Sequence, residues 1–103
     1  MKVEFKFDKT YVQKHKNSLN EIENLIIQSG LTKVKFGIYI GYTNKEIMNK
    51  LAFMLALKEW FIDNAKYCYF YFDENNEIKT DMLSVLKLNE DSSIIINWYL
   101  LIN

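Results

Sequence analysis

The chain has 103 residues, of which half are apolar and a quarter are charged, and its formal net charge is zero. This length is typical of one domain with one hydrophobic core, so we expect residues 1–103 to form a single domain. The sequence contains no proline, three glycines and no low-complexity stretch, which argues against linkers and disordered tails.

Charge is unevenly distributed, and all thirteen basic residues are lysine. Residues 1–35 hold seven lysines and four acidic residues, and residues 36–72 hold four lysines and three acidic residues. Residues 73–103 hold two lysines and six acidic residues. Arginine supplies the planar, bidentate group that proteins use on phosphates and base edges, and a neutral chain lacks a strong basic footprint. We therefore expect no nucleic-acid partner.

The same sequence argues against membrane insertion and export. The longest apolar run, 94–102, is interrupted by Asn97 and has about half the length of a membrane-spanning helix. The first seven residues alternate between polar and apolar types, without the apolar segment of a signal peptide. The single cysteine, Cys68, cannot form an internal disulfide, so we expect a cytoplasmic protein with no membrane contact.

Strands and helices are predicted in alternation along the first half of the chain. Residues 1–7 alternate as a half-buried strand does. A capping box beginning at Ser18 and the C-terminal Gly30 predict a helix over 19–29, although an earlier box at Thr10 leaves a start near residue 11 open. Residues 33–42 alternate again and predict a second strand.

The second half continues the same pattern. A capping box at Thr43 predicts a helix that ends near residue 63 or 64 and lays its main apolar face on the sheet. Residues 67–72 predict a third strand, followed by a turn at 73–77. From Thr80 a short helix is preferred, with a β-hairpin over 77–88 as the alternative. The apolar run 94–102 predicts the last strand.

These elements indicate an α/β or α+β domain in the order β-α-β-α-β-α-β. We expect a two-layer sandwich whose mixed sheet of about four strands is covered by two main helices, with a short third helix.

No catalytic, cofactor or metal site is predicted. His15 is the one histidine, and Cys68 lies in an alternating aromatic run, where a small buried residue is expected rather than a nucleophile. One histidine and one cysteine cannot supply the usual zinc ligands. The acidic turn 73–77 lacks EF-hand spacing, and assigning catalytic carboxylates to it would be arbitrary. We expect a protein that is not an enzyme and has no cofactor.

Two apolar surfaces exceed the needs of a small core. The first is a stripe on the second helix, formed by Phe53, Leu57 and Trp60, which is the spacing of anchors for a partner groove. The alternative is that segment 8–18 or the third helix covers this stripe.

The second surface is the outward face of the sheet. If Val34, Phe36, Ile38 and Ile40 face the core, the outward face carries Tyr39, Tyr67, Tyr69, Tyr71, Asn97 and Tyr99, flanked by Lys33 and Lys35. Tyrosine suits a surface that is exposed alone and buried in a complex. Stacking on single-stranded RNA is disfavoured, because the β-α-β-β-α-β order and the RNP motif are missing from the prediction. The alternatives are a homodimer interface and a face covered by the third helix.

Acidic residues are concentrated in the connections around the last two strands: Asp73, Glu74, Glu77, Asp81, Glu90 and Asp91. If these two strands run antiparallel, both acidic groups lie at the same end of the sheet and form an acidic edge. Such an edge would steer a basic protein such as a toxin or nuclease, although ordinary solvation is the simpler explanation. The sequence therefore favours a non-catalytic, stoichiometric inhibitor with the general build of bacterial immunity proteins and antitoxins. The alternative is a self-associating structural or regulatory subunit that forms a homodimer through its tyrosines.

Overall fold

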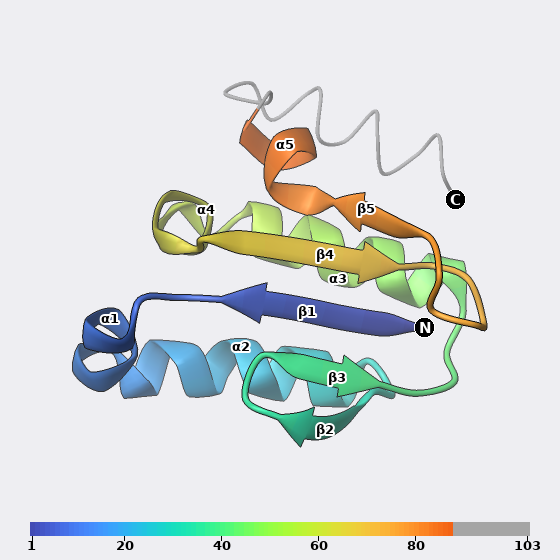
Figure 1. Cartoon of the computed structure of the whole chain (residues 1–103), viewed down its shortest axis with the longest axis horizontal. Coiled ribbons are helices and arrows are strands. Elements are labelled where there is room, and N and C mark those ends of the chain that lie inside the picture. Colours follow the sequence, from blue (N-terminus) through green and yellow to red (C-terminus); the bar gives the residue numbers. More distant parts are fainter. Residues whose placement is uncertain (88–103) are drawn as a thin grey trace.

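Residues 1–87 are described by the computed structural model, and their strands form one five-stranded sheet (Figure 1). The strands are β1 (Lys2–Lys6), β2 (Thr32–Lys35), β3 (Ile38–Ile40), β4 (Tyr67–Tyr71) and β5 (Lys79–Asp81). Their order is β2-β3-β1-β4-β5, and every pair of neighbours is antiparallel. The mixed α/β class is confirmed, but a mixed sheet of about four strands is wrong for this part of the chain. The predicted strand 94–102 lies outside the described residues.

Within residues 1–87, five helices accompany these strands: α1 (Lys9–Lys14), α2 (Lys16–Gln28), α3 (Lys45–Ala56), α4 (Glu59–Asn64) and α5 (Met82–Lys87). In Figure 1, α2 and α3 lie side by side behind β1, β3 and β4, while the opposite face of the sheet is turned toward the viewer. None of the helices in residues 1–87 has the length and apolar character needed to cross a bilayer.

Up to the end of β4, the elements follow the order β-α-β-β-α-β, if α1–α2 and α3–α4 are each taken as one interrupted helix. The four strands lie in the order β2-β3-β1-β4, which is the split β-α-β arrangement. The sequence prediction that this order is missing is therefore wrong. The error has one source, because residues 33–42 were predicted as a single strand and instead form the β2–β3 hairpin.

The hairpin turns at Gly37, where the backbone has φ +90°. A Cβ atom at this position would lie 2.5 Å from the carbonyl oxygen of Phe5, so the turn also packs directly against β1. The Phe5 amide donates to the Gly37 carbonyl oxygen at 2.9 Å. Only glycine fits both the backbone angle and the close approach. Alternation of apolar residues continues across this turn, which is why it resembles one strand.

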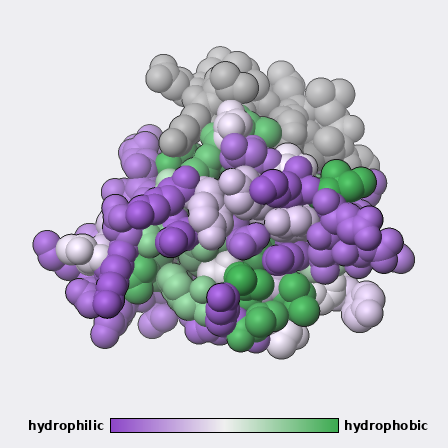
Figure 2. Space-filling model, viewed as in Figure 1, coloured by the Kyte–Doolittle hydropathy of each residue, from purple (hydrophilic) through white to green (hydrophobic). Residues whose placement is uncertain are grey.

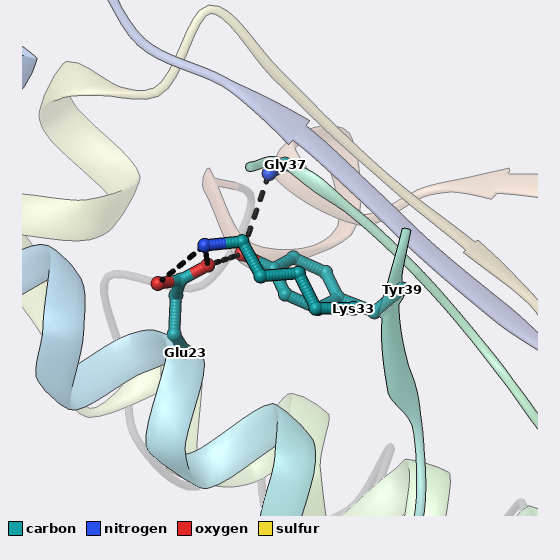
Figure 3. Close-up of polar contacts among 4 residues, drawn as sticks. All are labelled: Glu23, Lys33, Gly37 and Tyr39. Carbon is teal, nitrogen blue, oxygen red and sulfur yellow. Dashed lines mark hydrogen bonds and ion pairs between the residues drawn. The ribbon is translucent and has the colours of Figure 1, made fainter. Parts of the chain in front are cut away.

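The hairpin also reverses the predicted orientation of its side chains. Tyr39 pairs with Val3 of β1 and is fully buried on the helix side, whereas Ile40 is 41% exposed on the other face. The Tyr39 hydroxyl donates to the Glu23 carboxylate of α2 and accepts from the Gly37 amide at 3.3 Å. The Lys33 ammonium lies 2.9 Å from the same carboxylate (Figure 3). These contacts join α2 to the hairpin.

The core lies between the sheet and the two longer helices. It contains the inward residues of the strands and the apolar faces of α2 and α3, with Phe61 of α4 and the apolar face of α5. Its most buried members include Val3, Phe70, Ile22, Ile26, Met48 and Leu51. The predicted inward face of the first strand and the apolar face of the first predicted helix are confirmed. The apolar face predicted for the second helix is confirmed in part, because Met48, Leu51, Leu55 and Phe61 are buried but Met54 is 43% exposed.

Each of the two long predicted helices is interrupted in the structure. The sequence left the start of the first helix undecided and predicted the second helix as continuous. His15 separates α1 from α2, and its backbone adopts φ −126° and ψ 40°. Lys58 separates α3 from α4 with extended backbone angles, and its ammonium lies 2.8 Å from the Glu21 carboxylate of α2. A single helix from 44 to 63 or 64 is therefore wrong.

The region after β4 combines the two predicted alternatives. The strand predicted at 67–72 is confirmed as β4, and β5 pairs with it as a hairpin. The helix predicted from Thr80 is present as α5, beginning at Met82. Asp81 caps this helix, since its carboxylate accepts from the Ser84 amide at 3.3 Å and from the Ser84 hydroxyl at 2.9 Å.

Candidate functional site

The sheet face opposite α2 and α3 carries a row of three tyrosines from β4. Cys68 and Phe70 point into the core and are fully buried, so Tyr67, Tyr69 and Tyr71 point to the other face. On that face Tyr67 and Tyr69 are half-buried, whereas Tyr71 is only 9% exposed. Figure 2 views the molecule from this side. It shows mainly polar surface, with apolar side chains gathered over β2 and β3 in the lower part of the view. We take this face, which α2 and α3 do not cover, as the candidate site and refer to it below as the open face of residues 1–87.

The strand register arranges the open face in rows that cross the strands. One row contains Thr32, Ile40, Lys2, Tyr71 and Lys79. The next contains Lys35, Ile38, Glu4, Tyr69 and Asp81, and a shorter row contains Lys6 and Tyr67. Residues opposite one another on antiparallel strands share a face and lie within side-chain contact. The open face therefore has an apolar part over β3, a charged row on β1 and a tyrosine row on β4.

The three tyrosines are held by contacts within this face. The rings of Tyr67 and Tyr69 stack with centroids 5.0 Å apart, and the Lys79 ammonium lies 4.3 Å from the Tyr69 centroid. The Tyr71 hydroxyl donates to the Glu4 carboxylate at 3.1 Å, and the Lys2 ammonium lies 5.0 Å from the Tyr71 ring centroid. Ordered tyrosines lose little conformational entropy when a partner covers them.

Burial and a neighbouring carboxylate raise the pKa of two of these tyrosines, Tyr67 and Tyr71. The pKa of Tyr71 is raised by burial and by its hydrogen bond to Glu4. The pKa of Tyr67 is raised by burial and by the negative charge of Glu4. Both hydroxyls are hydrogen-bond donors at neutral pH, as any tyrosine hydroxyl is, and that of Tyr71 already donates to Glu4.

The tyrosine face predicted from sequence is only partly the one described. Tyr67, Tyr69 and Tyr71 share a face as expected, but Tyr39 belongs to the core and not to this surface. Asn97 and Tyr99 lie outside the described residues. The sequence reasoning missed Ile40 and Lys2, because the reversed hairpin moved Ile40 outward and the first strand was considered only for its buried side.

The predicted stripe on the second helix does not lie on one helix. Phe53 belongs to α3 and is half-buried, Leu57 follows the end of α3 and is 64% exposed, and Trp60 belongs to α4. The Trp60 ring stacks on Phe7 at 6.4 Å, and Phe7 stacks on Tyr11 of α1 at 5.2 Å. Phe7, which precedes segment 8–18, therefore packs on Trp60, and partner binding by these residues remains a prediction.

The acidic connection between β4 and β5 is largely a turn that is stabilised by hydrogen bonds to Asp73. The Asp73 carboxylate accepts from the backbone amides of Glu77 at 2.9 Å and Ile78 at 3.1 Å, and these hydrogen bonds lower its pKa. Glu74 and Glu77 are exposed. Glu90 and Asp91, the other part of the predicted acidic edge, lie outside the described residues, so the edge itself remains a prediction.

The residues considered for catalysis are not brought together. Cys68 is fully buried, and burial raises the pKa of its thiol, as expected for a core residue. His15 is exposed at the α1–α2 junction, where it stacks on Tyr11 at 4.2 Å and lines a shallow polar hollow with its neighbours in 13–18. Within residues 1–87, no three histidine, cysteine or acidic side chains are grouped so that they could hold a metal ion.

Comparisons of the chain with protein-family models, curated proteins and solved structures found no match. The β-α-β-β-α-β arrangement does not itself indicate a function, since one fold can host many unrelated sites. The functional inference therefore comes from the chemistry of the open face.

Proposed function

We propose that this chain is a non-catalytic, stoichiometric protein-binding domain that neutralises a toxin or a nuclease by covering it, as immunity proteins and antitoxins do. The observation that carries the proposal is the row formed by Tyr67, Tyr69 and Tyr71 on the face away from α2 and α3. In this proposal the cytoplasmic protein has two layers, the helices and the sheet, and its partner binds on the free side of the sheet.

The row supports a protein interface because tyrosine combines a large apolar ring with a polar hydroxyl. Such residues are enriched at interfaces and frequently contribute most of the binding energy. Beside the row, Ile40 is 41% exposed on the same face, which adds apolar area. The proposed binding site is the surface formed by these residues.

The experiment is purification of the tagged chain from its native host, followed by native mass spectrometry of any complex. The test variant replaces Tyr67 and Tyr69 by serine, and the control replaces Tyr42, which is 94% exposed outside the strands. We expect a one-to-one heteromeric complex with the wild type and the control, and its loss with the test variant. A complex that survives the test variant would place the interface elsewhere, for example at Leu57.

The alternative function is a homodimer formed through the same face, and the tyrosine row also supports it. The charges of the face oppose it, because two copies would bring lysine-rich surfaces together. Sedimentation at increasing concentration distinguishes the two. A chain that remains a monomer excludes the homodimer, whereas a dimer that dissociates when Tyr67 and Tyr69 are replaced would exclude the inhibitor.

A further inference from the structure

The open face has more positive than negative groups. Its paired positions hold four lysines, Lys2, Lys6, Lys35 and Lys79, and two acidic residues, Glu4 and Asp81. The whole chain is neutral, so this face differs in sign from the chain average. A surface of this kind attracts a partner of opposite charge and orients it during association.

Both carboxylates of the face are already engaged within the chain. Glu4 accepts from the Tyr71 hydroxyl and lies 4.0 Å from the Lys2 ammonium. Asp81 accepts from both the amide and the hydroxyl of Ser84 at the start of α5. Neither carboxylate is available to pair with a basic side chain of a partner without losing these hydrogen bonds, which stabilise the fold.

Three of the lysines are in the opposite situation. Lys6, Lys35 and Lys79 are exposed, and none of them pairs with a carboxylate of residues 1–87. Lys79 lies over the ring of Tyr69, which holds its ammonium beside the tyrosine row. The groups of this face that lack an ionic partner in the described chain are therefore cations on both sides of the tyrosines.

The rings themselves are less suited to nucleic acid. Single-stranded nucleic acid binds to lysine-rich sheets by stacking bases on free aromatic faces. Here Tyr69 is stacked on Tyr67 and lies under Lys79, and Tyr71 lies under Lys2. A base would have to displace these contacts. An acidic side chain needs only the ammonium groups of Lys6, Lys35 and Lys79, which pair with no carboxylate of residues 1–87.

We propose that the open sheet face binds an acidic segment of a partner protein, with Lys6, Lys35 and Lys79 pairing with its carboxylates beside the tyrosine row. This inference rests on the proposed protein-binding function and states the chemistry of the segment that contacts the sheet. The partner charge that this inference requires is opposite to the one predicted from the acidic connection, where Glu74 and Glu77 would attract a basic partner.

The test uses three labelled probes with the full chain at low ionic strength: a glutamate dodecapeptide, a lysine dodecapeptide and a thymidine dodecanucleotide. The test variant combines K6E, K35E and K79E. The matched control combines K16E, K45E and K50E, which changes the net charge equally with exposed lysines of α2 and α3. Binding is followed by fluorescence anisotropy and mapped by chemical-shift changes in the amide NMR spectrum, which also shows that each variant is folded.

We expect the glutamate peptide to bind, to shift amides of β1, β4 and β5, and to lose about tenfold in affinity with the test variant but less than about twofold with the control. Absence of binding, or equal loss with both variants, overturns the proposal. Tighter binding of the nucleotide would overturn it in favour of single-stranded nucleic acid. Tighter binding of the lysine peptide would overturn it in favour of the acidic connection.

The purification described under the proposed function separates the two hypotheses. A one-to-one complex that requires Tyr67 and Tyr69, together with no binding of the glutamate peptide, would leave the protein-binding function intact and overturn only the acidic segment. Binding of the glutamate peptide without any stoichiometric partner would instead overturn the inhibitor and leave the charge preference of the face.

Discussion

Replacing Gly37 by alanine tests the account of the β2–β3 hairpin, and Gly30 provides a matched control. Both glycines have positive φ, +90° and +96° respectively. A Cβ atom at Gly37 would lie 2.5 Å from the Phe5 carbonyl oxygen, whereas at Gly30 its nearest neighbours are 3.8 Å away. The two substitutions therefore share the backbone strain and differ in the collision with β1.

The expected losses follow from these two contributions. A left-handed backbone costs a non-glycine residue about 1–2 kcal/mol, so Gly30→Ala should lose about that much. Gly37→Ala adds an overpacking cost of about 1–3 kcal/mol, since the contacted atom belongs to the backbone and cannot move alone. The reduced entropy of the unfolded chain favours alanine equally at both sites and cancels in the comparison.

The assay is urea unfolding of the wild type and the two variants, with the free energy of unfolding compared at equal slope. We expect Gly37→Ala to lose at least about 1 kcal/mol more than Gly30→Ala. In NMR spectra, its largest shifts should be at Phe5, whose amide donates to Gly37. Equal losses in the two variants would refute the close approach of the hairpin to β1.

Further predictions concern single side chains. Tyr39→Phe removes the acceptor of the Gly37 amide and a donor to Glu23, so unfolding should become easier by about 1–3 kcal/mol in urea titrations; no change would argue against this network. Cys68 is buried with a raised thiol pKa, so thiol reagents should label it only along the unfolding transition; rapid labelling of the native protein would contradict its placement. Backbone hydrogen bonds lower the pKa of Asp73, so its stabilising effect is complete above the usual carboxyl pKa and is lost as pH falls through the lower, folded value. Asp73→Asn should therefore flatten the acid side of a plot of unfolding midpoint against pH, and an unchanged slope would exclude this contribution.

Elements with one clear period and one buried face could be predicted from the sequence. The strand at the N-terminus alternates because only one of its sides packs on the helices, and Val3 and Phe5 are buried as expected. The apolar stripe of α2 was predicted for the same reason, since Ile22 and Ile26 face the sheet. The run of aromatic residues at β4 also gave the correct strand, including the burial of Cys68.

The features that escaped prediction depend on contacts between distant segments. The sequence alone does not show whether the chain continues as one strand through Gly37 or turns there. The turn depends on β1, against which the backbone of Gly37 packs too closely for a side chain. The break between α3 and α4 has no proline or glycine, and the ammonium of Lys58 pairs with α2 at this point. The side of the sheet occupied by Tyr39 follows from the hairpin and could not be assigned before it.

The charge of the candidate site could likewise not be predicted from the sequence. That Tyr67, Tyr69 and Tyr71 share one face follows from their spacing alone. The charge of that face does not, because it is set by which residues of β1, β2 and β5 the register places beside the tyrosines. The distribution of charge along the sequence predicted an acidic edge and a basic partner. The assembled face instead combines lysines that pair with no carboxylate of residues 1–87 with carboxylates that are already hydrogen-bonded. The register of the sheet, more than the composition of the chain, therefore sets the charge of this face, and the acidic partner segment that we propose follows from that charge.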